Sequence, residues 1–598
     1  MTMDQTADEI RVHDATKIEL ADGALAQIRS LHRKNAQLLA EREDHRPLTV
    51  RVARGLRRAR RNGWRVHRYP RDFRRGMLAS KTSKLARADI DRLMNLITKR
   101  KYGQAIAFAA ALLPDKGDDK EFLETARLAF TRAGAMSLQV AAVAALRAQG
   151  DSSGLKKQEL TILSRIRETE PDWLPSVSRD LRLREDPQPG RVLHLLKVSM
   201  PHRQSGYTMR SQYILDSQRA GGLDPVAMTA LGFPRQIGNT DGVTYETVNG
   251  TPHHRLDVDD PDELSRFYDV YLDAYAEAAA ARIVDISPSV LHVHSGHHGY
   301  EPALVGLALA RQFDLPMIYE VRGFFESTWS SDLAWNERGE IYARRYATET
   351  RCMREADAVV TLSESMRSEI VARGVPADKV FVVPNGVDIE NFHPRPRSEA
   401  LVERLGLAGK FTFGYVSNLD HYREGHEALI QAAAELRRRG VPAVALIVGD
   451  GSRREELEAL AASEDAGDSV IFTGRVPHDE VLDYYRLLDV FVVPRVPERA
   501  ARLVTPLKPF EAMAAGLPIV VSDLEALLEI VGDGERGRAF EAGNATSLAD
   551  VLQQLHVDPD LRTDLAKRGR DWVIAERQWS VNAKRYADIY AAIGTTAP

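Results

Sequence analysis

From Arg191 onward, short apolar segments alternate with longer segments that have the spacing of amphipathic helices. The stretch Arg191 to Leu215 gives an apolar strand, a polar loop that contains Gly206, and a helix; Val470 to Pro494 repeats this arrangement. Alternating strands and helices are typical of a parallel sheet with helices on both faces, because parallel strands need long crossover connections. The sequence therefore predicts an α/β fold built on doubly wound, Rossmann-like sheets.

The length and composition of the chain agree with a multidomain globular protein. At 598 residues it is too long for one hydrophobic core, which favours about three or four structural units. Hydrophobic residues make up 44% and charged residues 28%, and the net charge of −4 gives no reason to expect nucleic-acid binding. The single cysteine, Cys352, excludes an intrachain disulfide and a cysteine metal cluster, which suits a reducing compartment.

The N-terminus gives no sign of export. Its first residues are polar and acidic and lack the basic start and apolar core of a secretory signal. The longest apolar stretches, such as Ala105 to Leu113, are far shorter than the roughly 20 residues that cross a bilayer. We therefore expect a cytoplasmic protein whose membrane contact, if any, is peripheral and at the inner face.

Residues 1–185 are predicted to form an all-α region, because apolar residues recur there at helical spacing and strand patterns are scarce. Packed alanines indicate paired helices, and a tetratricopeptide-like repeat is one interpretation, although no fixed period is evident. The expected helices are Ile28 to Leu39, Ile90 to Ile97, Tyr102 to Leu113, Glu121 to Ala133 and Ser137 to Ala148.

A strongly basic patch lies within this region. Between Arg51 and Arg75 there are eleven arginines and one acidic residue, Asp72, with aromatic residues interleaved. Arginines beside interfacial aromatics are suited to an anionic membrane surface, a lipid diphosphate or nucleic acid. Peripheral membrane contact is favoured over nucleic acid, and a solvated face or internal ion pairs with acidic helices is the alternative.

The stretch TPLKPFEAMAAGLPIVVS (Thr505 to Ser522) has the pattern of a short helix that leads into a buried strand. Lys508 lies at the predicted start of the helix, where free backbone N–H groups and the positive dipole end favour phosphate. Glu511 lies one turn further on nearly the same face, where its carboxylate can accept hydrogen bonds from sugar hydroxyls. The pair predicts a nucleotide-sugar site; the alternative is a solvated Lys–Glu pair on a surface helix.

This stretch resembles the donor-site motif of the retaining GT-B glycosyltransferases of family four, in the subgroup whose motif reads PLKPxEAMAxG. The wider family has another glutamate eight positions before Glu511, and that position is Leu503 here. The segment Val380 to Pro394 resembles the interdomain hinge of the family, with Asn385 and Gly386 at the turn. The resemblance covers roughly residues 190 to 595.

The resemblance implies two Rossmann-like domains that face each other across a cleft. It divides the chain into a helical region (1–185), an acceptor-side domain (186–398), a nucleotide-sugar domain (399–575) and a final helix that crosses back (576–598). The first region is not covered by the resemblance, and its role is left open.

The resemblance implies that loops at the strand ends of the second domain bind the nucleotide-sugar donor. Most of the family has Gly-Arg at the positions of Ser417 and Asn418, so the usual arginine is replaced here, and Arg423 is the candidate to supply the missing cation. Lys508 is the first candidate to neutralise the donor diphosphate. The residues expected to contact or flank the nucleotide sugar are Asn418, Arg423, Asp450, Gly451, Val476, Thr505, Pro506 and Leu507.

On the acceptor side, the candidates follow strands of the first domain. Gly206 lies at a turn where a glycine allows the backbone to approach a ligand closely, and the resemblance places it in the acceptor-side glycine loop. Glu320 and Arg322 are expected to face the cleft, because ligands bind beyond the carboxyl ends of parallel strands. A structural ion pair is the alternative for both residues.

The strand that begins at Val290 ends in a histidine-rich turn, and the histidines available there are His292, His294, His297 and His298. A metal site is one interpretation, but the spacings are short, no carboxylate cluster accompanies the histidines, and the family that the chain resembles is metal-independent. We expect His294 to donate to a sugar or phosphate, and we expect no metal or other cofactor.

The sequence thus predicts a retaining glycosyltransferase that moves a sugar from a nucleoside diphosphate sugar to a glycan or lipid-linked acceptor, in cell-envelope or exopolysaccharide synthesis. A nucleotide-sugar epimerase and a catalytically inactive scaffold are the alternatives; the intact PLKPFEAMAAG segment argues against the scaffold. Sugar, base, acceptor, linkage and oligomeric state are left open. The candidate catalytic residues are Lys508, Glu511, Glu320, Arg322 and His294.

Overall fold

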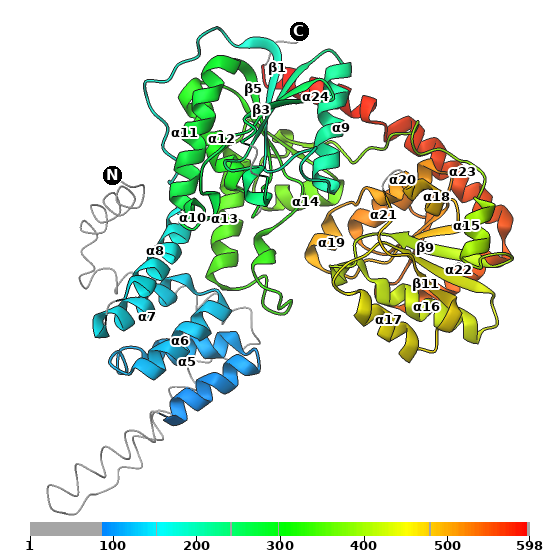
Figure 1. Cartoon of the computed structure of the whole chain (residues 1–598), viewed down its shortest axis with the longest axis horizontal. Helices are drawn as coiled ribbons and strands as arrows, with labels where there is room; N and C mark the ends of the chain where they lie inside the picture. The colour runs from blue at the N-terminus through cyan, green and yellow to red at the C-terminus, as the bar shows by residue number, and fades with distance from the viewer. Residues whose placement is uncertain (1–86, 151, 240–241, 297, 478–479, 595–598) are drawn as a thin grey trace, which may run out of the picture. The chain divides into compact units, whose positions relative to one another are not determined.

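The computed structural model describes residues 87–594 apart from 151, 240–241, 297 and 478–479 (Figure 1). The predicted helix Ile28 to Leu39 and the basic patch Arg51 to Arg75 therefore lie outside the described residues. The chain forms two compact units. The first unit runs through Trp173 and includes Leu264–Tyr271 and Trp329–Arg344, and the second unit contains the remainder.

The described part of the N-terminal region is all-helical, as predicted. Its core contains Leu93, Phe122 and Phe130, each fully buried. The side chain of Asp119 caps α6 by accepting from the backbone N–H of Phe122, and Gly134 ends that helix in the left-handed conformation. The helices are residues 87–98, α5 (Tyr102–Leu112), α6 (Lys120–Ala133), α7 (Met136–Gln149) and α8 (Ser153–Arg167).

Segments from much later in the chain complete this unit. The ring of Trp335 packs edge-on against Tyr102 with 5.7 Å between centroids, and its indole N–H donates to the carbonyl of Ala133 at 3.1 Å. A Cβ at Gly134 would lie 2.6 Å from the Trp329 ring, so the position needs glycine for the close approach as well as for its φ of +67°. The sequence analysis did not anticipate that these segments belong with the helical region.

The second unit contains two doubly wound sheets, which confirms the predicted fold class. The first sheet has the order β3-β4-β2-β1-β5-β6-β7-β8 and is parallel except for the antiparallel edge strand β3. Buried Val, Leu and Ile side chains dominate its central strands, as both faces are covered. Its strands are β1 (Gln188–Leu196), β2 (Asp224–Thr229), β3 (Tyr245–Val248), β4 (Thr251–His254), β5 (Pro288–His294), β6 (Met317–Glu320), β7 (Ala358–Thr361) and β8 (Val380–Val382).

The second sheet has the order β11-β10-β9-β12-β13-β14, with parallel pairing between all neighbours. It forms the largest buried hydrophobic cluster among the described residues together with α16 and α22. Its strands are β9 (Phe411–Val416), β10 (Ala443–Val448), β11 (Val470–Phe472), β12 (Val490–Val493), β13 (Ile519–Ser522) and β14 (Gly537–Phe540).

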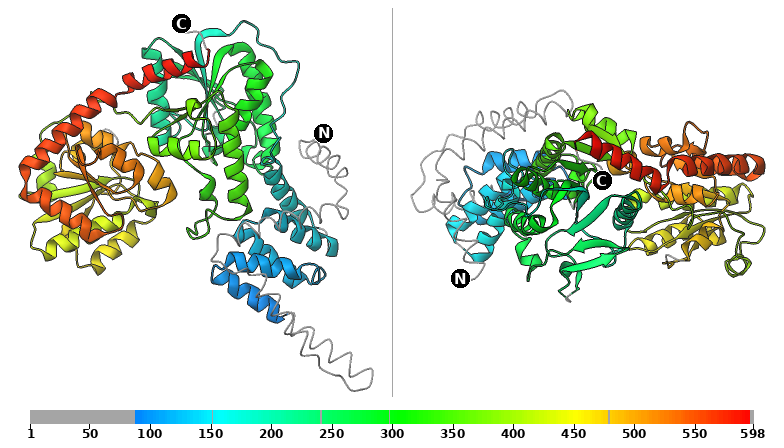
Figure 2. Two further views of the ribbon diagram at one scale, coloured as in Figure 1. Left: turned by 180° about the vertical axis from the view of Figure 1, so that it is seen from behind. Right: turned by 90° about the horizontal axis from the view of Figure 1, so that it is seen from above.

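Helices cover both sheets (Figures 1 and 2). Those associated with the first sheet are α9 (Gly206–Ala220), α10 (Pro261–Leu264), α11 (Tyr268–Ile286), α12 (Glu301–Phe313), α13 (Gly339–Glu355) and α14 (Glu364–Ala372). Those associated with the second are α15 (Glu399–Arg404), α16 (His426–Arg438), α17 (Arg454–Ser463), α18 (Val481–Tyr485), α19 (Arg499–Leu503), α20 (Lys508–Ala514), α21 (Glu525–Val531), α22 (Ala545–Val557) and α23 (Pro559–Glu576).

The last helix, α24 (Trp579–Ala592), packs against α9 and the first sheet (Figure 2). Its buried face carries Trp579, Tyr586, Ile589 and Tyr590. These side chains share a hydrophobic cluster with residues of β1, β5, β6, β7 and β8 and with Val383, which directly follows β8. Among the described residues, none of the helices has the length and apolar character required to cross a bilayer.

The strand orders locate the ligand-binding edges. In an open parallel sheet, ligands bind beyond the carboxyl ends of the strands where the strand order reverses. That reversal lies between β1 and β5 in the first sheet and between β9 and β12 in the second. The loops that carry the sequence-predicted residues follow these strands and their neighbours.

Candidate functional site

The first turn of α20 carries the predicted donor pair. The ammonium of Lys508 lies 3.0 Å from Oε2 of Glu511, and the hydroxyl of buried Tyr485 donates to the same oxygen at 2.8 Å. Burial and the Glu511 carboxylate raise the pKa of Tyr485, so its hydroxyl stays protonated and donates. The pair is therefore held by a third, buried group, unlike a freely solvated Lys–Glu pair.

The predicted acceptor-side loop lies against this donor segment. A capping box between Ser205 and Thr208 starts α9 at Gly206, which is exposed. A Cβ at Gly206 would lie 3.7 Å from Cδ1 of Leu507, the residue immediately before Lys508. The structure thus brings together two loops that are 300 residues apart in the sequence.

The loops after β9 and β10 are joined to each other by hydrogen bonds. The backbone N–H of Leu419 donates to the carbonyl of Asp450 at 3.1 Å, and that of Ser452 donates to the Asp420 carboxylate at 2.7 Å. A Cβ at Gly451 would lie 2.5 Å from the backbone carbon of Leu419, so the approach requires glycine. Exposed Asn418 lies beside these residues, and its side-chain carbonyl accepts from the Asp420 N–H.

The remaining predicted donor residues are spread around this edge. Val476 follows β11 and is half-buried against the second core. Thr505 and Pro506 precede Lys508; Thr505 is 5% exposed, and its carbonyl accepts a hydrogen bond of 2.8 Å from the side chain of Asn385. The position of Leu503 is the half-buried end of α19.

Arg423, the predicted replacement cation, is one-third exposed, and its Nε lies 3.5 Å from Oε1 of Glu424. The structure reveals a second arginine there that the sequence analysis missed. The side chain of Arg495 is 12% exposed. It donates to both oxygens of Glu424 at 3.2 Å and to the carbonyl of Val504 at 3.0 Å. Arg495 therefore fixes Val504, the residue that precedes Thr505. Its position two residues after β12 is the sequence feature that could have indicated a site residue.

On the acceptor side, Glu320 is fully buried at the end of β6. Its Oε1 accepts from Arg210 at 3.0 Å and from Arg322 at 2.7 Å, and its Oε2 accepts from Tyr586 at 2.6 Å and faces His292 at 3.1 Å. Burial alone would raise the pKa of Glu320, but the two guanidinium groups and these hydrogen bonds hold it well below its ordinary value. Glu320 therefore forms the internal ion pair that the sequence left open as the alternative to a cleft residue.

Hydrogen-bond directions in this cluster follow from Arg322, because a guanidinium donates and never accepts. Its terminal nitrogen lies 2.6 Å from Nδ1 of His294, so that nitrogen must accept. A neutral His294 then donates from Nε2 to Nδ1 of His194, 2.9 Å away. His194 in turn donates from Nε2 to the side-chain carbonyl of Gln218, also at 2.9 Å.

The same directions continue to the carboxylate. The Gln218 amide donates to the Tyr590 hydroxyl at 2.8 Å, which lies 2.7 Å from Nδ1 of His292. With Tyr590 donating to His292 and His292 donating to Glu320, every proton has an acceptor. Burial is the largest cause that lowers the pKa of all three histidines, so the imidazoles are neutral, as this arrangement requires.

Among the described residues, His194, His292 and His294 have the spacing that could hold a metal ion, since one ring nitrogen from each lies within 4.8 Å of the others. Each of the six ring nitrogens already has a hydrogen-bond partner. A cation would therefore have to displace the network rather than fill free coordination positions. His298 instead pairs with Glu301, and His297 lies outside the described residues.

Arg210 is another buried arginine that the sequence analysis did not single out. It is 2% exposed and joins α9, β6, the hinge and α24. Arg210, Ile214 and Gln218 are buried at i, i+4 and i+8 of α9. A charged residue on the same helical face as an apolar residue is the sequence feature that could have indicated a buried arginine. The acceptors of Arg210 are Glu320, Val383 and Pro384 (both through their carbonyls), the Asn385 side chain and Tyr586, at 2.9 to 3.2 Å.

Comparison with known protein families gives two matches, and together they include strands of both sheets. The family described as "Glycosyl transferases group 1" matches residues 398–572, and the "Glycosyl transferase 4-like domain" matches residues 205–386. These ranges include the loops around Gly206, Glu320, Asn418 and Lys508.

Curated relatives are similar to part of the chain. A GDP-mannose-dependent alpha-(1-6)-phosphatidylinositol monomannoside mannosyltransferase of Mycobacterium tuberculosis is 32% identical over 235 residues, which are 39% of this chain and 61% of the relative. The chain therefore spans less than two thirds of that relative's length. The protein of the same description from Mycolicibacterium smegmatis is 30% identical over 300 residues, 49% of this chain and 77% of the relative.

Among solved structures, sucrose-phosphate synthase from Thermosynechococcus elongatus is similar with a TM-score of 0.55. The similarity covers 67% of this chain and 99% of that chain at 22% sequence identity. At this identity the likeness concerns the fold, which is the GT-B arrangement of two Rossmann-like domains.

Proposed function

Because the chain belongs to the GT-B glycosyltransferases of family 4, we propose that it moves a sugar from a nucleoside diphosphate sugar to an acceptor hydroxyl with retention of configuration. The acceptor would be a glycan or a lipid-linked saccharide in cell-envelope or exopolysaccharide synthesis. The mannosyltransferase relatives put GDP-mannose first among the donors to test.

The observation that carries this proposal is the Lys508–Glu511 pair. It is held by Tyr485 and lies next to Leu507, which meets the Gly206 loop. Departure of the diphosphate from an oxocarbenium-like centre requires positive charge already in place, and the Lys508 ammonium supplies it. Because α20 has only seven residues, this charge would come from the side chain rather than from the helix dipole.

The other residues would bind or position. Glu511 uses Oε2 for Lys508 and Tyr485, which leaves Oε1 to accept from sugar or ribose hydroxyls, as no described residue donates to it. The loops of Asn418 and Asp450 would enclose the nucleotide, with Arg423 as a second cation. On the acceptor side, Arg322 donates to the Tyr207 carbonyl at 3.1 Å and so would orient the Gly206 loop.

Two measurements test the proposal. Thermal unfolding is followed with UDP, GDP, ADP and TDP sugars, without added metal, for the wild type, Lys508→Ala and the exposed-lysine control Lys567→Ala. We expect one nucleotide to stabilise the wild type and the control but not Lys508→Ala. The anomeric configuration of the transferred sugar, read by NMR, then tests retention; an inverted product or no stabilisation by any of the nucleotide sugars would contradict the proposal.

A further inference from the structure

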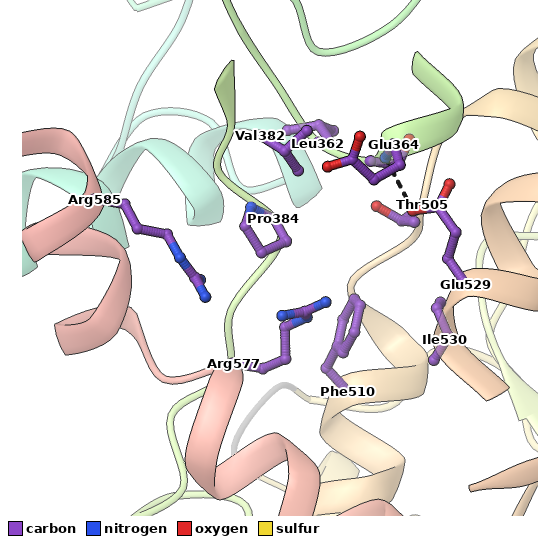
Figure 3. A pocket seen from close by; sticks show the side chains of 11 residues that line it. Leu362, Glu364, Val382, Pro384, Thr505, Phe510, Glu529, Ile530, Arg577 and Arg585 are labelled. Atoms are coloured by element: carbon purple, nitrogen blue, oxygen red, sulfur yellow. Dashed lines mark hydrogen bonds between the residues drawn. The ribbon is translucent and has the colours of Figure 1, made fainter. Parts of the chain in front are cut away.

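A cavity of about 220 Å³ lies between the hinge, the segment before α20 and the junction of α23 and α24 (Figure 3). Among the described residues, Lys508 and Glu511 are not part of its lining, so it is separate from the donor pair. At about 30 Å³ for each water molecule, the cavity has room for a small polyatomic ion with its hydration. Its apolar wall is formed by Leu362, Val382, Pro384, Phe510 and Ile530.

Thr505 contributes a buried hydroxyl to the cavity (Figure 3). The residue is 5% exposed, and its Oγ1 has no hydrogen-bond partner among the described residues. Buried polar groups in folded proteins are nearly always hydrogen-bonded, so an unpaired hydroxyl that lines a cavity points to a polar ligand there.

Two arginines extend toward the cavity from the end of α23 and from α24 (Figure 3). The guanidinium of Arg577 lies 4.3 Å from the ring centre of Trp572, and its buried Nε has no partner among the described residues. Burial and the neighbouring cation Arg585 lower the pKa of Arg577 to about 10. Arg585 forms an ion pair of 3.0 Å with Glu576 and donates to Asn582, and it is also part of the lining.

The carboxylates of the cavity are compensated elsewhere. Glu529 accepts from the backbone N–H groups of Glu364 at 2.9 Å and Ser365 at 2.7 Å, so the first turn of α14 balances its charge. The Glu364 side chain is 65% exposed and lies 3.7 Å from Arg367. Arg585 is itself paired with the Glu576 carboxylate, so Arg577 supplies the positive charge of the lining that no carboxylate pairs with among the described residues.

We propose that this cavity binds a small phosphate-type anion, with Arg577 supplying positive charge, Arg585 contributing further N–H donors and the Thr505 hydroxyl donating a hydrogen bond. Guanidinium groups match the geometry of phosphate oxygens, and burial strengthens such charge-assisted bonds. Because Pro384 belongs to the hinge and Thr505 to the segment before Lys508, occupancy of this cavity and donor binding would affect each other reciprocally.

The test is calorimetric titration of the full chain with inorganic phosphate and, separately, with mannose 6-phosphate. The first titration measures the affinity for the free ion. Tighter binding of mannose 6-phosphate than of inorganic phosphate would show that the cavity prefers the phosphate group of a sugar phosphate. We expect binding to weaken about tenfold or more in Arg577→Gln and Arg585→Gln and to persist in Arg568→Gln, an exposed arginine of α23. Persistence in Lys508→Ala would separate this cavity from the donor pair.

Thr505→Val provides a further variant, because it removes the unpaired hydroxyl while keeping the shape of the side chain. We expect an unchanged or higher melting temperature without ligand and phosphate binding weaker by about tenfold or more, the worth of one hydrogen bond to a charged group. If Arg577→Gln does not fold, Arg585→Gln carries the test. The proposal would be overturned if the wild type did not bind phosphate, or if both arginine variants bound it as tightly as the wild type. Loss of binding in Lys508→Ala alone would also overturn it, whatever the transfer activity.

Discussion

The side-chain amide of Asn385 donates a hydrogen bond of 2.8 Å to the carbonyl of Thr505, so the hinge is tied directly to the segment that carries Lys508. The side-chain carbonyl of Asn385 accepts from Arg210 at 3.0 Å, and Arg210 donates to Glu320 at 3.0 Å. A chain of three hydrogen bonds therefore leads from a buried carboxylate of the first sheet to the segment that precedes α20.

Replacement of Asn385 tests this connection. Asn385→Ala leaves the Thr505 carbonyl and one Arg210 nitrogen without their side-chain partner, and we expect unfolding to require about 1–3 kcal/mol less free energy. We also expect the KM for the nucleotide sugar to rise. Urea unfolding and donor kinetics measure both effects, and Asn391→Ala, which loses an exposed contact with Asp388, is the control. Unchanged unfolding and unchanged KM in Asn385→Ala would contradict the connection.

Glu320→Gln tests the buried charge cluster. The substitution removes the negative charge between Arg210 and Arg322, and an uncompensated buried charge costs about 3–5 kcal/mol. Urea unfolding should show a loss of that size. Glu355→Gln, whose partner Arg311 is mostly exposed, should change stability by less than about 1 kcal/mol. A similar small change in Glu320→Gln would show that the cluster is not what holds this domain together.

The pH dependence of stability follows from buried His253. Burial lowers its pKa to about 4, whereas in the unfolded chain it is near 6.5. The unfolded state therefore binds the proton first, and the stability that neutral His253 contributes above pH 6.5 is lost as the pH falls toward 4. Between pH 7 and pH 5 this residue alone should account for about 2 kcal/mol.

Urea unfolding at pH 7 and pH 5 for the wild type and His253→Gln measures that contribution. We expect the pH-dependent loss of stability to be smaller by about this amount in His253→Gln. Replacement of the exposed His421 by Gln is the control. An identical loss in the wild type and His253→Gln would show that the folded protein protonates His253 without cost.

Gly206 and Gly449, the residue directly after β10, tolerate a side chain to very different degrees. A Cβ at Gly449 would lie 1.9 Å from the Ser417 carbonyl, and its φ is +143°, so Gly449→Ala should destabilise the fold by about 3 kcal/mol or more. A Cβ at Gly206 meets Leu507 at an ordinary contact distance, so Gly206→Ala should change stability by less than about 0.5 kcal/mol. Thermal unfolding of both variants checks this contrast, which equal effects would contradict.

The fold class could be predicted from the sequence because the patterns that indicate strands and helices are local. The apolar strands, their helices and the segment Thr505 to Ser522 are each readable within about 25 residues, and the strand at Ile519–Ser522 and the helix at Lys508–Ala514 lie where this pattern indicates. Strand order and the facing of Gly206 toward Leu507 need contacts between distant residues, which local periodicity does not contain.

The buried network shows where sequence reasoning stops. Glu320 and Arg322 are predicted to face the cleft because they lie at a strand end, and only the structure supplies Arg210 and Tyr586 as partners of Glu320. These contacts join residues 110 and 266 positions apart. The packing of Trp335 on the helical unit has the same long-range origin.

The most direct test of the proposed function is acceptor-dependent release of the nucleoside diphosphate, compared between the wild type, Lys508→Ala and Lys567→Ala. We expect kcat to fall about tenfold or more in Lys508→Ala, because the leaving diphosphate loses its preorganised charge, while its melting temperature and the kcat of Lys567→Ala stay at wild-type values. Wild-type turnover in Lys508→Ala would contradict the assignment of this lysine to the donor diphosphate.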